Sequence, residues 1–253
     1  MLFRSMDKFT LPTADYEAAI EKIEAKQIRA LKARGRAFMN RVLARRPDQN
    51  GRVLELGPDE VVFDFKRRFV DYKRPWLPFE DPERLKRILQ NHKAHYILSG
   101  RVHSGDERMM KRLNEVLEKI RGDEYLNTHV HYIADYDEEL ARALSVGSNV
   151  TINIPIVGLE ACGTSWEKDV ANLCLLVSTH DGGVADAPSD SYLNVSGANE
   201  KEEIESMYQR MEEAAAVWEN DFDLEYWTHR QLARYLPTVS GARMLKDYLD
   251  YLF

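Results

Sequence analysis

The first part of the chain carries apolar residues at helical spacing between residues 13 and 46. These positions are Ile20, Ile23, Ile28, Leu31, Phe38, Val42 and Leu43. They recur every three or four residues, as one face of an α-helix does. Thr13 is a residue type that caps helices, and Pro47 and Gly51 end the pattern. We therefore predict one long helix over residues 13–46.

Short β-type runs alternate with helical stretches from about residue 53 onwards. The runs lie at 61–65, 95–99, 129–133, 150–154 and 174–178, and the helical stretches lie at 81–91, 106–120, 137–144 and after Gly163. Strands that alternate with helices at this spacing are typical of a parallel sheet covered by helices. The pattern predicts an α/β fold with a Rossmann-like parallel sheet and flanking helices.

The last part of the chain reads as helical. Helical periodicity covers 202–219 and 224–236, and a final amphipathic stretch covers 242–253. Residues 180–199 are rich in Gly, Asp, Ser and Asn, which predicts a long loop. We divide the chain into an N-terminal helical segment (1–52), a Rossmann-like domain (53–199) and C-terminal helices that pack on the same domain (200–253).

Composition and charge exclude several classes of protein. The 253 residues are 44% hydrophobic and 30% charged, which is enough apolar material for a core, and the net charge is −7. A nucleic-acid-binding domain would be basic. No stretch approaches the roughly 20 apolar residues of a membrane span, and residues 1–10 lack a signal peptide's apolar run. Cys162 and Cys174 form neither a disulfide framework nor a zinc-site spacing, so we predict a reduced, cytoplasmic protein without a metal.

A basic cluster follows the first predicted strand, in F-K-R-R-F-V-D-Y-K-R-P (65–75). Its members are Lys66, Arg67, Arg68, Lys73 and Arg74. Ligands of open α/β sheets bind beyond the carboxyl ends of the strands, and Arg and Lys suit phosphate oxygens. The cluster is interpreted either as an anion site or as a solvated turn balanced by Asp64 and Asp71.

Two further loops follow predicted strands. In G-R-V-H-S-G-D (100–106), His103 is a candidate donor to a ligand, and a plain connecting loop is the alternative. In G-L-E-A-C-G-T-S-W-E-K (158–168), Thr164 or Ser165 can cap a helix whose free N–H groups favour an anion. Lys168 falls about one turn into that helix, where it either lies near a bound phosphate or is an ordinary exposed lysine.

Taken in order, these stretches resemble motifs of the α-glucan (glycogen, starch and maltodextrin) phosphorylases. Residues 65–75 resemble the family's arginine-rich segment that ends in tyrosine-lysine-arginine, and S-G-R-V-H-S-G-D (99–106) is similar to its glycine-lysine-alanine-histidine-proline segment. I-A-D-Y-D-E-E-L-A-R-A-L (133–144) resembles its leucine-glutamate-aspartate-tyrosine-aspartate segment. E-A-C-G-T-S-W-E-K (160–168) resembles its pyridoxal-phosphate segment, E-A-S-G-T-S-G-M-K. H-D-G (180–182) and S-G-A-R-M-L-K-D-Y (240–248) resemble the leucine-aspartate-glycine and the closing helix that follow it.

The resemblance covers roughly residues 55–253 and implies a fold and a reaction. The fold is the C-terminal half of a GT-B glycosyltransferase, which has two Rossmann-like domains facing across a cleft. The reaction is attack of orthophosphate on the terminal α-1,4 glucosyl unit of a glucan, which gives glucose 1-phosphate with retention. Pyridoxal phosphate acts there through its phosphate group, while a lysine holds its aldehyde as a Schiff base.

The resemblance also assigns roles to residues of this chain, position by position. The catalytic set is Lys168, Arg68 and Lys73. The cofactor-binding set is Lys168, the Schiff-base lysine, with Thr164, Ser165, Tyr136 and Arg67. The substrate-binding set is Glu160, Ala161, Cys162, Gly163 and His103.

Three positions in the cofactor segment depart from the family pattern. Cys162 stands in place of a serine, and Trp166 and Glu167 replace a small residue and a methionine. We expect Trp166 to put bulk where the chain passes close to the phosphate. Glu167 puts negative charge beside the anion, and like charge weakens anion binding.

Three interpretations remain open for the function, because 253 residues cannot hold both halves of a phosphorylase. The first is a phosphorylase half that needs a separate N-terminal half. The second is a non-catalytic relative that binds a glucan or a partner protein, and the third is another GT-B glycosyltransferase that uses a nucleotide sugar. The expected partners are an α-glucan, phosphate and either an N-terminal half or a second copy of the chain. An apolar face on the first or the last helix would be the contact surface.

Overall fold

The computed structural model describes residues 13–239, 244 and 248. Its sheet has six strands, namely β1 (Val61–Lys66), β2 (Ala94–Ser99), β3 (Val130–Ile133), β4 (Val150–Asn153), β5 (Leu175–Thr179) and β6 (Leu193–Val195). All paired strands are parallel, and their order is β3-β2-β1-β4-β5-β6. This is the order of the doubly wound Rossmann fold. The predicted α/β class and parallel sheet are therefore confirmed.

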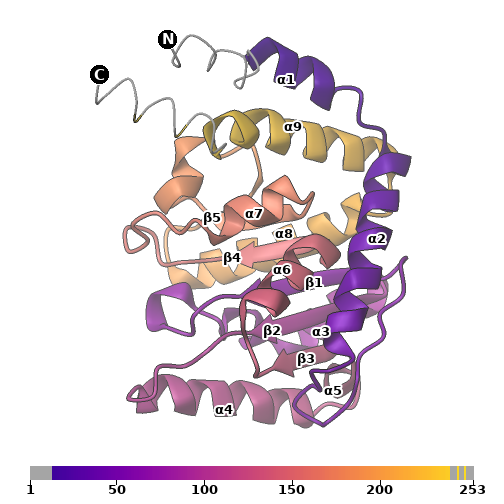
Figure 1. The fold of residues 1–253 in the computed structure, drawn as a ribbon. Helices are drawn as coiled ribbons and strands as arrows, with labels where there is room; N and C mark the ends of the chain where they lie inside the picture. Colours follow the sequence, from indigo (N-terminus) through magenta and orange to yellow (C-terminus); the bar gives the residue numbers. More distant parts are fainter. Residues whose placement is uncertain (1–12, 240–243, 245–247, 249–253) are drawn as a thin grey trace.

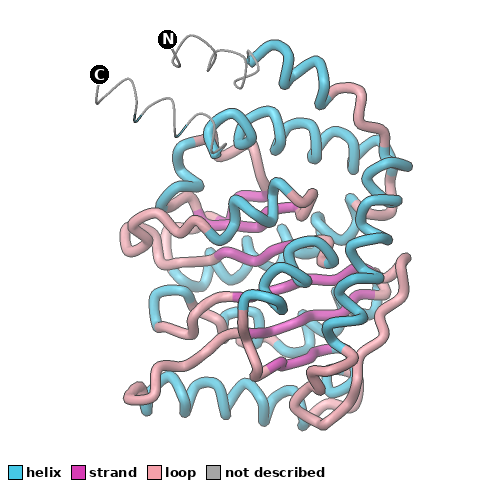
Figure 2. The backbone as a smooth tube through the Cα atoms, viewed as in Figure 1, coloured by secondary structure: helices cyan, strands magenta, loops and turns pink. Residues whose placement is uncertain are grey.

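Helices cover both faces of the sheet (Figure 1). They are α1 (Thr13–Ile20), α2 (Ala25–Leu43), α3 (Pro82–Asn91), α4 (Glu107–Arg121), α5 (Leu126–His129), α6 (Glu138–Gly147), α7 (Ser165–Ala171), α8 (Glu200–Val217) and α9 (Asp221–Val239). Short 3-10 turns lie at Asp71–Lys73, Leu77–Phe79 and Gly182–Asp186. Figure 2 shows the strands enclosed between layers of helix. No helix of the described ranges is long and apolar enough to cross a membrane.

The two faces of the sheet carry different side chains because successive strand residues point to opposite sides. One face is apolar and packs on α3, α4 and α8, with Phe63, Phe65, Tyr96 and Ile152 in one large core. The other face packs on α2 and α6 through Val62 and other aliphatic residues. That second face also carries buried polar residues at alternate strand positions: Asp64, Lys66, Thr151, Asn153, His131 and Ser99. The polar face lies under α2, α6 and α7.

The long N-terminal helix predicted over 13–46 is wrong in one respect, since it is two helices. The chain leaves the helical conformation after Ile20, and α2 starts after Glu24, whose backbone is extended (φ −89°, ψ 154°). Glu24 and Gln27 form a capping box in which each side chain bonds the other's backbone N–H. The break lets α1 pack on α9 while α2 packs on α6 (Figure 1). Helical periodicity alone cannot show such a break, because the apolar spacing continues through it.

The long loop predicted over 180–199 is also wrong in part. It contains the 3-10 turn at Gly182–Asp186 and the short edge strand β6, which pairs with β5 through Leu193, Asn194 and Val195. A three-residue strand is too short to show the alternation that identifies strands. The helix predicted over 242–253 lies almost wholly outside the described residues.

Candidate functional site

Two loops meet at the point where the strand order reverses. The loop after β1 (67–74) and the loop after β4 (154–164) leave neighbouring strands, which is where doubly wound folds bind ligands. The Ile156 amide donates to the Tyr72 carbonyl at 2.7 Å. Arg74, in the left-handed region (φ 51°), donates to the carbonyls of Ile154 at 2.9 Å and Pro155 at 3.1 Å, and its other guanidinium nitrogen pairs with Glu203. Arg74 thus holds the two loops together and is not free to bind a ligand.

Lys73 and Glu160 form a largely buried ion pair between these loops. The Glu160 amide donates to Asp181 Oδ2 at 2.9 Å, so the predicted H-D-G stretch lies against the same loop. The Gly183 amide donates to the Cys162 carbonyl at 2.8 Å. This segment makes tight turns, with Gly163 at φ 70°, and a Cβ there would lie 2.9 Å from the Glu160 carboxyl carbon. The positive φ at position 163 therefore favours glycine, which lets the loop fold back on Glu160.

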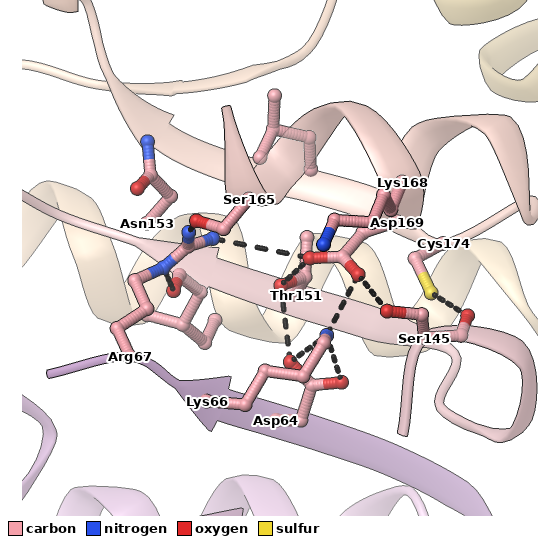
Figure 3. A network of polar contacts seen from close by, with 12 residues as sticks. Asp64, Lys66, Arg67, Ser145, Thr151, Asn153, Ser165, Lys168, Asp169 and Cys174 are labelled. Carbon is pink, nitrogen blue, oxygen red and sulfur yellow. Dashed lines mark hydrogen bonds and ion pairs between the residues drawn. The ribbon is translucent and has the colours of Figure 1, made fainter. Parts of the chain in front are cut away.

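Arg67 connects the β1 loop to α7, as the dashed lines of Figure 3 show. One terminal nitrogen of its guanidinium, Nη1, donates to the Ser165 hydroxyl, and Nε lies 3.4 Å from the Ile152 carbonyl. The other terminal nitrogen, Nη2, lies 3.9 Å from Asp169 Oδ2 and is buried without a hydrogen-bond partner. A buried guanidinium N–H without an acceptor is uncommon and leaves capacity for one more oxygen.

Lys168 and Arg68 are the two exposed cations of the predicted catalytic set. Within the described part of the chain, neither side chain has a hydrogen bond or an ion pair. Both are therefore available to an incoming anion or carbonyl group.

Trp166 does not lie beside Lys168, in contrast to the bulk we expected near the phosphate. Its ring is buried and packs edge-on against Tyr235 of α9, with centroids 4.6 Å apart. Successive helix residues point about 100° apart, so Ser165 lies between the exposed Lys168 and the buried Asp169 around α7, while Trp166 and Val170 point into the core. Burial raises the pKa of Glu167, whose charged neighbours are Lys168 and Asp186. The two departures from the family pattern thus lie off the side that carries Ser165.

The remaining predicted residues are distributed around this edge. The Tyr136 hydroxyl donates to the Lys66 carbonyl at 3.2 Å, next to Arg67. Ala161, Cys162 and Thr164 are exposed, and Gly163 is half-buried. Thr164 precedes α7, but its backbone is helical and its side chain makes no capping hydrogen bond, so the predicted side-chain cap is absent. His103 is exposed and accepts a hydrogen bond from its neighbour Gly105, and no contact joins it to the other site residues that are described.

Sequence reasoning missed the partners of Lys66, which had been grouped with the candidate anion ligands. Lys66 lies on the buried polar face, between Asp64 of its own strand and Asp169 of α7. The alternation of β1 offered a signal, since Asp64 and Lys66 are two positions apart and so share one face. Nothing local pointed to Asp169, which comes from a helix more than 100 positions away.

A sheet of this order, with basic loops at the switch point, defines a Rossmann-type α/β protein with a candidate ligand edge. A family model, "Carbohydrate phosphorylase", matches residues 21–238. The chain belongs to the carbohydrate phosphorylase family, whose fold is GT-B.

The similar proteins include phosphorylases of bacteria and archaea. The chain is 31% identical over 212 residues to the maltodextrin phosphorylase of Thermococcus litoralis, covering 79% of this chain and 25% of that protein. It is 28% identical over 215 residues to the glycogen phosphorylase of Aquifex aeolicus, covering 79% and 31%. It is also 26% identical over 215 residues to an uncharacterised protein of Methanocaldococcus jannaschii, covering 81% and 40%. The chain thus spans about a quarter to two fifths of the length of these relatives.

Proposed function

We propose that the edge between the β1 and β4 loops is the cofactor and phosphate site of an α-glucan phosphorylase-type glycosyltransferase. The observation that carries the proposal is the placement of Lys168. Its amine is exposed and unpaired, and it sits one helical turn from Ser165, which Arg67 contacts directly. Family membership supports the same assignment.

The residues present fit pyridoxal phosphate, the cofactor that phosphorylases of this family normally use. An aldehyde cofactor needs an uncommitted amine, and Lys168 supplies one. A phosphate group needs cationic donors. The exposed Arg68 has no partner, and Nη2 of Arg67 is paired with Asp169 at 3.9 Å but makes no hydrogen bond. Trp166, the bulkiest departure from the family pattern, is packed in the core under α9. Room at Lys168 is therefore not taken by its indole.

Each residue then has a distinct task. Lys168 anchors the cofactor, with Thr164, Ser165, Tyr136 and Arg67 around it. Arg68 and Lys73 balance phosphate charge, and Lys73 can do so only by sharing its ammonium with Glu160, its present partner. The substrate-binding residues are Glu160, Ala161, Cys162, Gly163 and His103.

The reaction would be phosphorolysis of an α-1,4-glucan to glucose 1-phosphate. Pyridoxal phosphate, when bound, would supply a phosphate group that can exchange a proton with the substrate phosphate. The protein's cations keep the two phosphates together, because like charges at close range repel strongly in a site shielded from water. We propose that the rest of the glucan site comes from an N-terminal half, since the matched part makes up only 25% of the maltodextrin phosphorylase and 40% of the Methanocaldococcus jannaschii protein. A cytoplasmic location suits the two free thiols of Cys162 and Cys174.

Cofactor binding is tested by chemical trapping. The protein is mixed with pyridoxal phosphate, reduced with borohydride and digested, and the modified peptide is mapped by mass spectrometry. We expect the label on Lys168 and its loss in Lys168→Ala. The exposed Lys26→Ala serves as a matched control and should keep the label.

Two results would contradict the cofactor assignment. One is a label spread over surface lysines with no preference for Lys168, and the other is equal labelling of Lys168→Ala. Binding of a glucan without any trapped pyridoxal phosphate would favour a non-catalytic glucan-binding relative. Turnover of a nucleotide sugar would favour another GT-B glycosyltransferase.

A further inference from the structure

Three buried charged side chains lie directly beneath the candidate site. The Lys66 ammonium is 2.8 Å from Asp64 Oδ2 and 2.8 Å from Asp169 Oδ1, and all three side chains are at most 3% exposed. It also bonds Asp64 Oδ1 at 2.8 Å. An ammonium has three N–H donors, and carboxylate oxygens take all of them. Lys66 is therefore not available to bind a ligand.

The two carboxyl groups are not equivalent, because one ammonium cannot balance two negative charges in a buried site. Burial raises the pKa of Asp64, which favours its protonated form. Burial opposes ionisation of Asp169 as well, but Lys66 and Arg67 outweigh it and lower the pKa of that carboxyl. Lys66 and Arg67 therefore favour the ionised form of Asp169, whereas burial favours the protonated form of Asp64.

Asp169 connects α7 to three other elements at once (Figure 3). The hydroxyl of Ser145 in α6 donates to Oδ1 at 2.7 Å, and the hydroxyl of Thr151 in β4 donates to Oδ2 at 3.0 Å. With Lys66 of β1, these donors bind both carboxylate oxygens. Asp64 instead bonds Lys66 of β1 and Thr151 of β4, and no residue of α7. Of the two carboxyls, only Asp169 belongs to the helix that carries Ser165 and Lys168.

We propose that Asp169 is a positioning residue for the site. By binding Lys66, Ser145 and Thr151, its carboxylate sets the rotation of the short helix α7, so that Ser165 meets Arg67 and the adjacent Lys168 faces the same edge. The role assigned to Lys168 rests on the proposed function, whereas the hold on α7 does not.

The experiment compares two neutralising variants within one cluster, Asp169→Asn and Asp64→Asn. Each replaces a carboxyl group that contacts the Lys66 ammonium with an amide of about the same size. The readouts are the apparent Kd for pyridoxal phosphate from borohydride trapping at Lys168, the melting temperature, and hydrogen exchange of the α7 amides. We expect Asp169→Asn to weaken trapping about tenfold or more, since small misplacements of a reacting group carry large penalties. Asp64→Asn should stay within about twofold of the parent protein, because Asp64 bonds Lys66 of β1 and Thr151 of β4 and no residue of α7.

Faster exchange in α7 is expected for Asp169→Asn alone. Equal effects of the two variants on trapping and exchange, or no effect of Asp169→Asn, would overturn the proposal. If the parent protein is not trapped at Lys168, the cofactor assignment fails and hydrogen exchange alone decides the hold on α7. If Asp169→Asn does not fold, Lys66→Met/Asp169→Leu, which removes both charges together, takes its place with the same expected loss.

Discussion

At the scale of single residues, neighbours along α7 have opposite environments. Trp166 is buried under Tyr235, Lys168 is exposed at the site, and Asp169 is bound inside the sheet. A change at one of these positions should therefore affect one property and leave the others.

Replacing the buried indole tests this separation. Trp166→Ala removes a large side chain from the cluster with Val170 and Tyr235, and we expect it to lower the free energy of unfolding by about 3–5 kcal/mol. At low temperature, where the variant stays folded, trapping of pyridoxal phosphate at Lys168 should persist. Thermal melting and peptide mapping measure the two effects. If Trp166→Ala is as stable as the parent protein but no longer traps pyridoxal phosphate at Lys168, the indole belongs to the site.

Two histidines on the polar face predict how stability depends on pH. His95 Nδ1 lies 3.1 Å from His131 Nε2, and His131 Nδ1 lies 3.2 Å from Asp48 Oδ2. Burial, together with the neighbouring His131, lowers the pKa of His95 to about 3, and burial lowers the pKa of His131. The folded protein thus keeps both rings neutral, while the unfolded chain takes up protons below about pH 6.5.

The free energy of unfolding should therefore fall as the pH drops below about 6.5, by up to about 1.4 kcal/mol per pH unit for each ring. For His95 the loss continues down to about pH 3. Urea titrations between pH 7 and pH 4 measure it. His95→Gln should make the free energy of unfolding depend less steeply on pH between pH 6.5 and pH 4. An unchanged slope in His95→Gln would refute the assignment.

At the scale of elements, α2 and α6 cross closely at two glycines. A Cβ on Gly35 would lie 2.0 Å from the carbonyl oxygen of Val146, and a Cβ on Gly147 would lie 2.6 Å from Met39 Cβ. Backbone cannot retreat as a flexible side chain can, so glycine at position 35 is required for this packing. Both helices cover the polar face that holds Lys66 and Asp169.

The close crossing predicts that replacing a helix glycine with alanine lowers the free energy of unfolding, although this change usually raises it. Alanine is ordinarily better than glycine inside a helix by about 1 kcal/mol. We nevertheless expect Gly35→Ala to lower the free energy of unfolding by about 1–3 kcal/mol, because overpacking forces the helices apart. The exposed Ala37→Gly in the same helix should follow propensity and cost about 1 kcal/mol. Denaturant melts measure both, and a stabilised Gly35→Ala would contradict the close crossing.

At the scale of the whole molecule, an apolar turn projects beside the candidate site. Ile156, Val157 and Leu159 are 40%, 54% and 58% exposed, and they directly precede Glu160. The turn is closed by a hydrogen bond from the Leu159 amide to the Ile156 carbonyl at 3.1 Å. The apolar contact surface was expected on the first or the last helix. On α2 the exposed large apolar residue is Leu31, and the two described residues of the last predicted helix, Met244 and Tyr248, are 55% and 60% exposed.

Activity should depend on a second half of the protein. We expect the chain alone to release no glucose 1-phosphate from maltodextrin and phosphate. Release should appear once an N-terminal phosphorylase half is supplied, for example from the Thermococcus litoralis relative. Lys168→Ala in the same mixture is the control and should abolish release. Release by the chain alone would show that no second half is needed, and none in the presence of that half would favour a binding role.

Much of the fold could be predicted because its signals are local. The periods of apolar residues located five of the six strands, and the order of the motifs pointed to the family that the comparison with phosphorylases confirms. The break before α2 and the strand β6 were missed, because one follows from a capping box and the other is only three residues long. The division into 1–52, 53–199 and 200–253 stays a prediction.

The sequence by itself determined the class of fold and the residue types available at the carboxyl ends of β1 and β4. Those properties depend on spacing along the chain, and spacing is written in the sequence. Only the tertiary structure decided which cations are free. Arg74 and Lys66 are bound to backbone and carboxyl groups, Lys73 is paired with Glu160, and Lys168 and Arg68 are left exposed. The reason is that charge pairing depends on distance in space, and Lys66 meets Asp169 only once α7 has packed on the sheet.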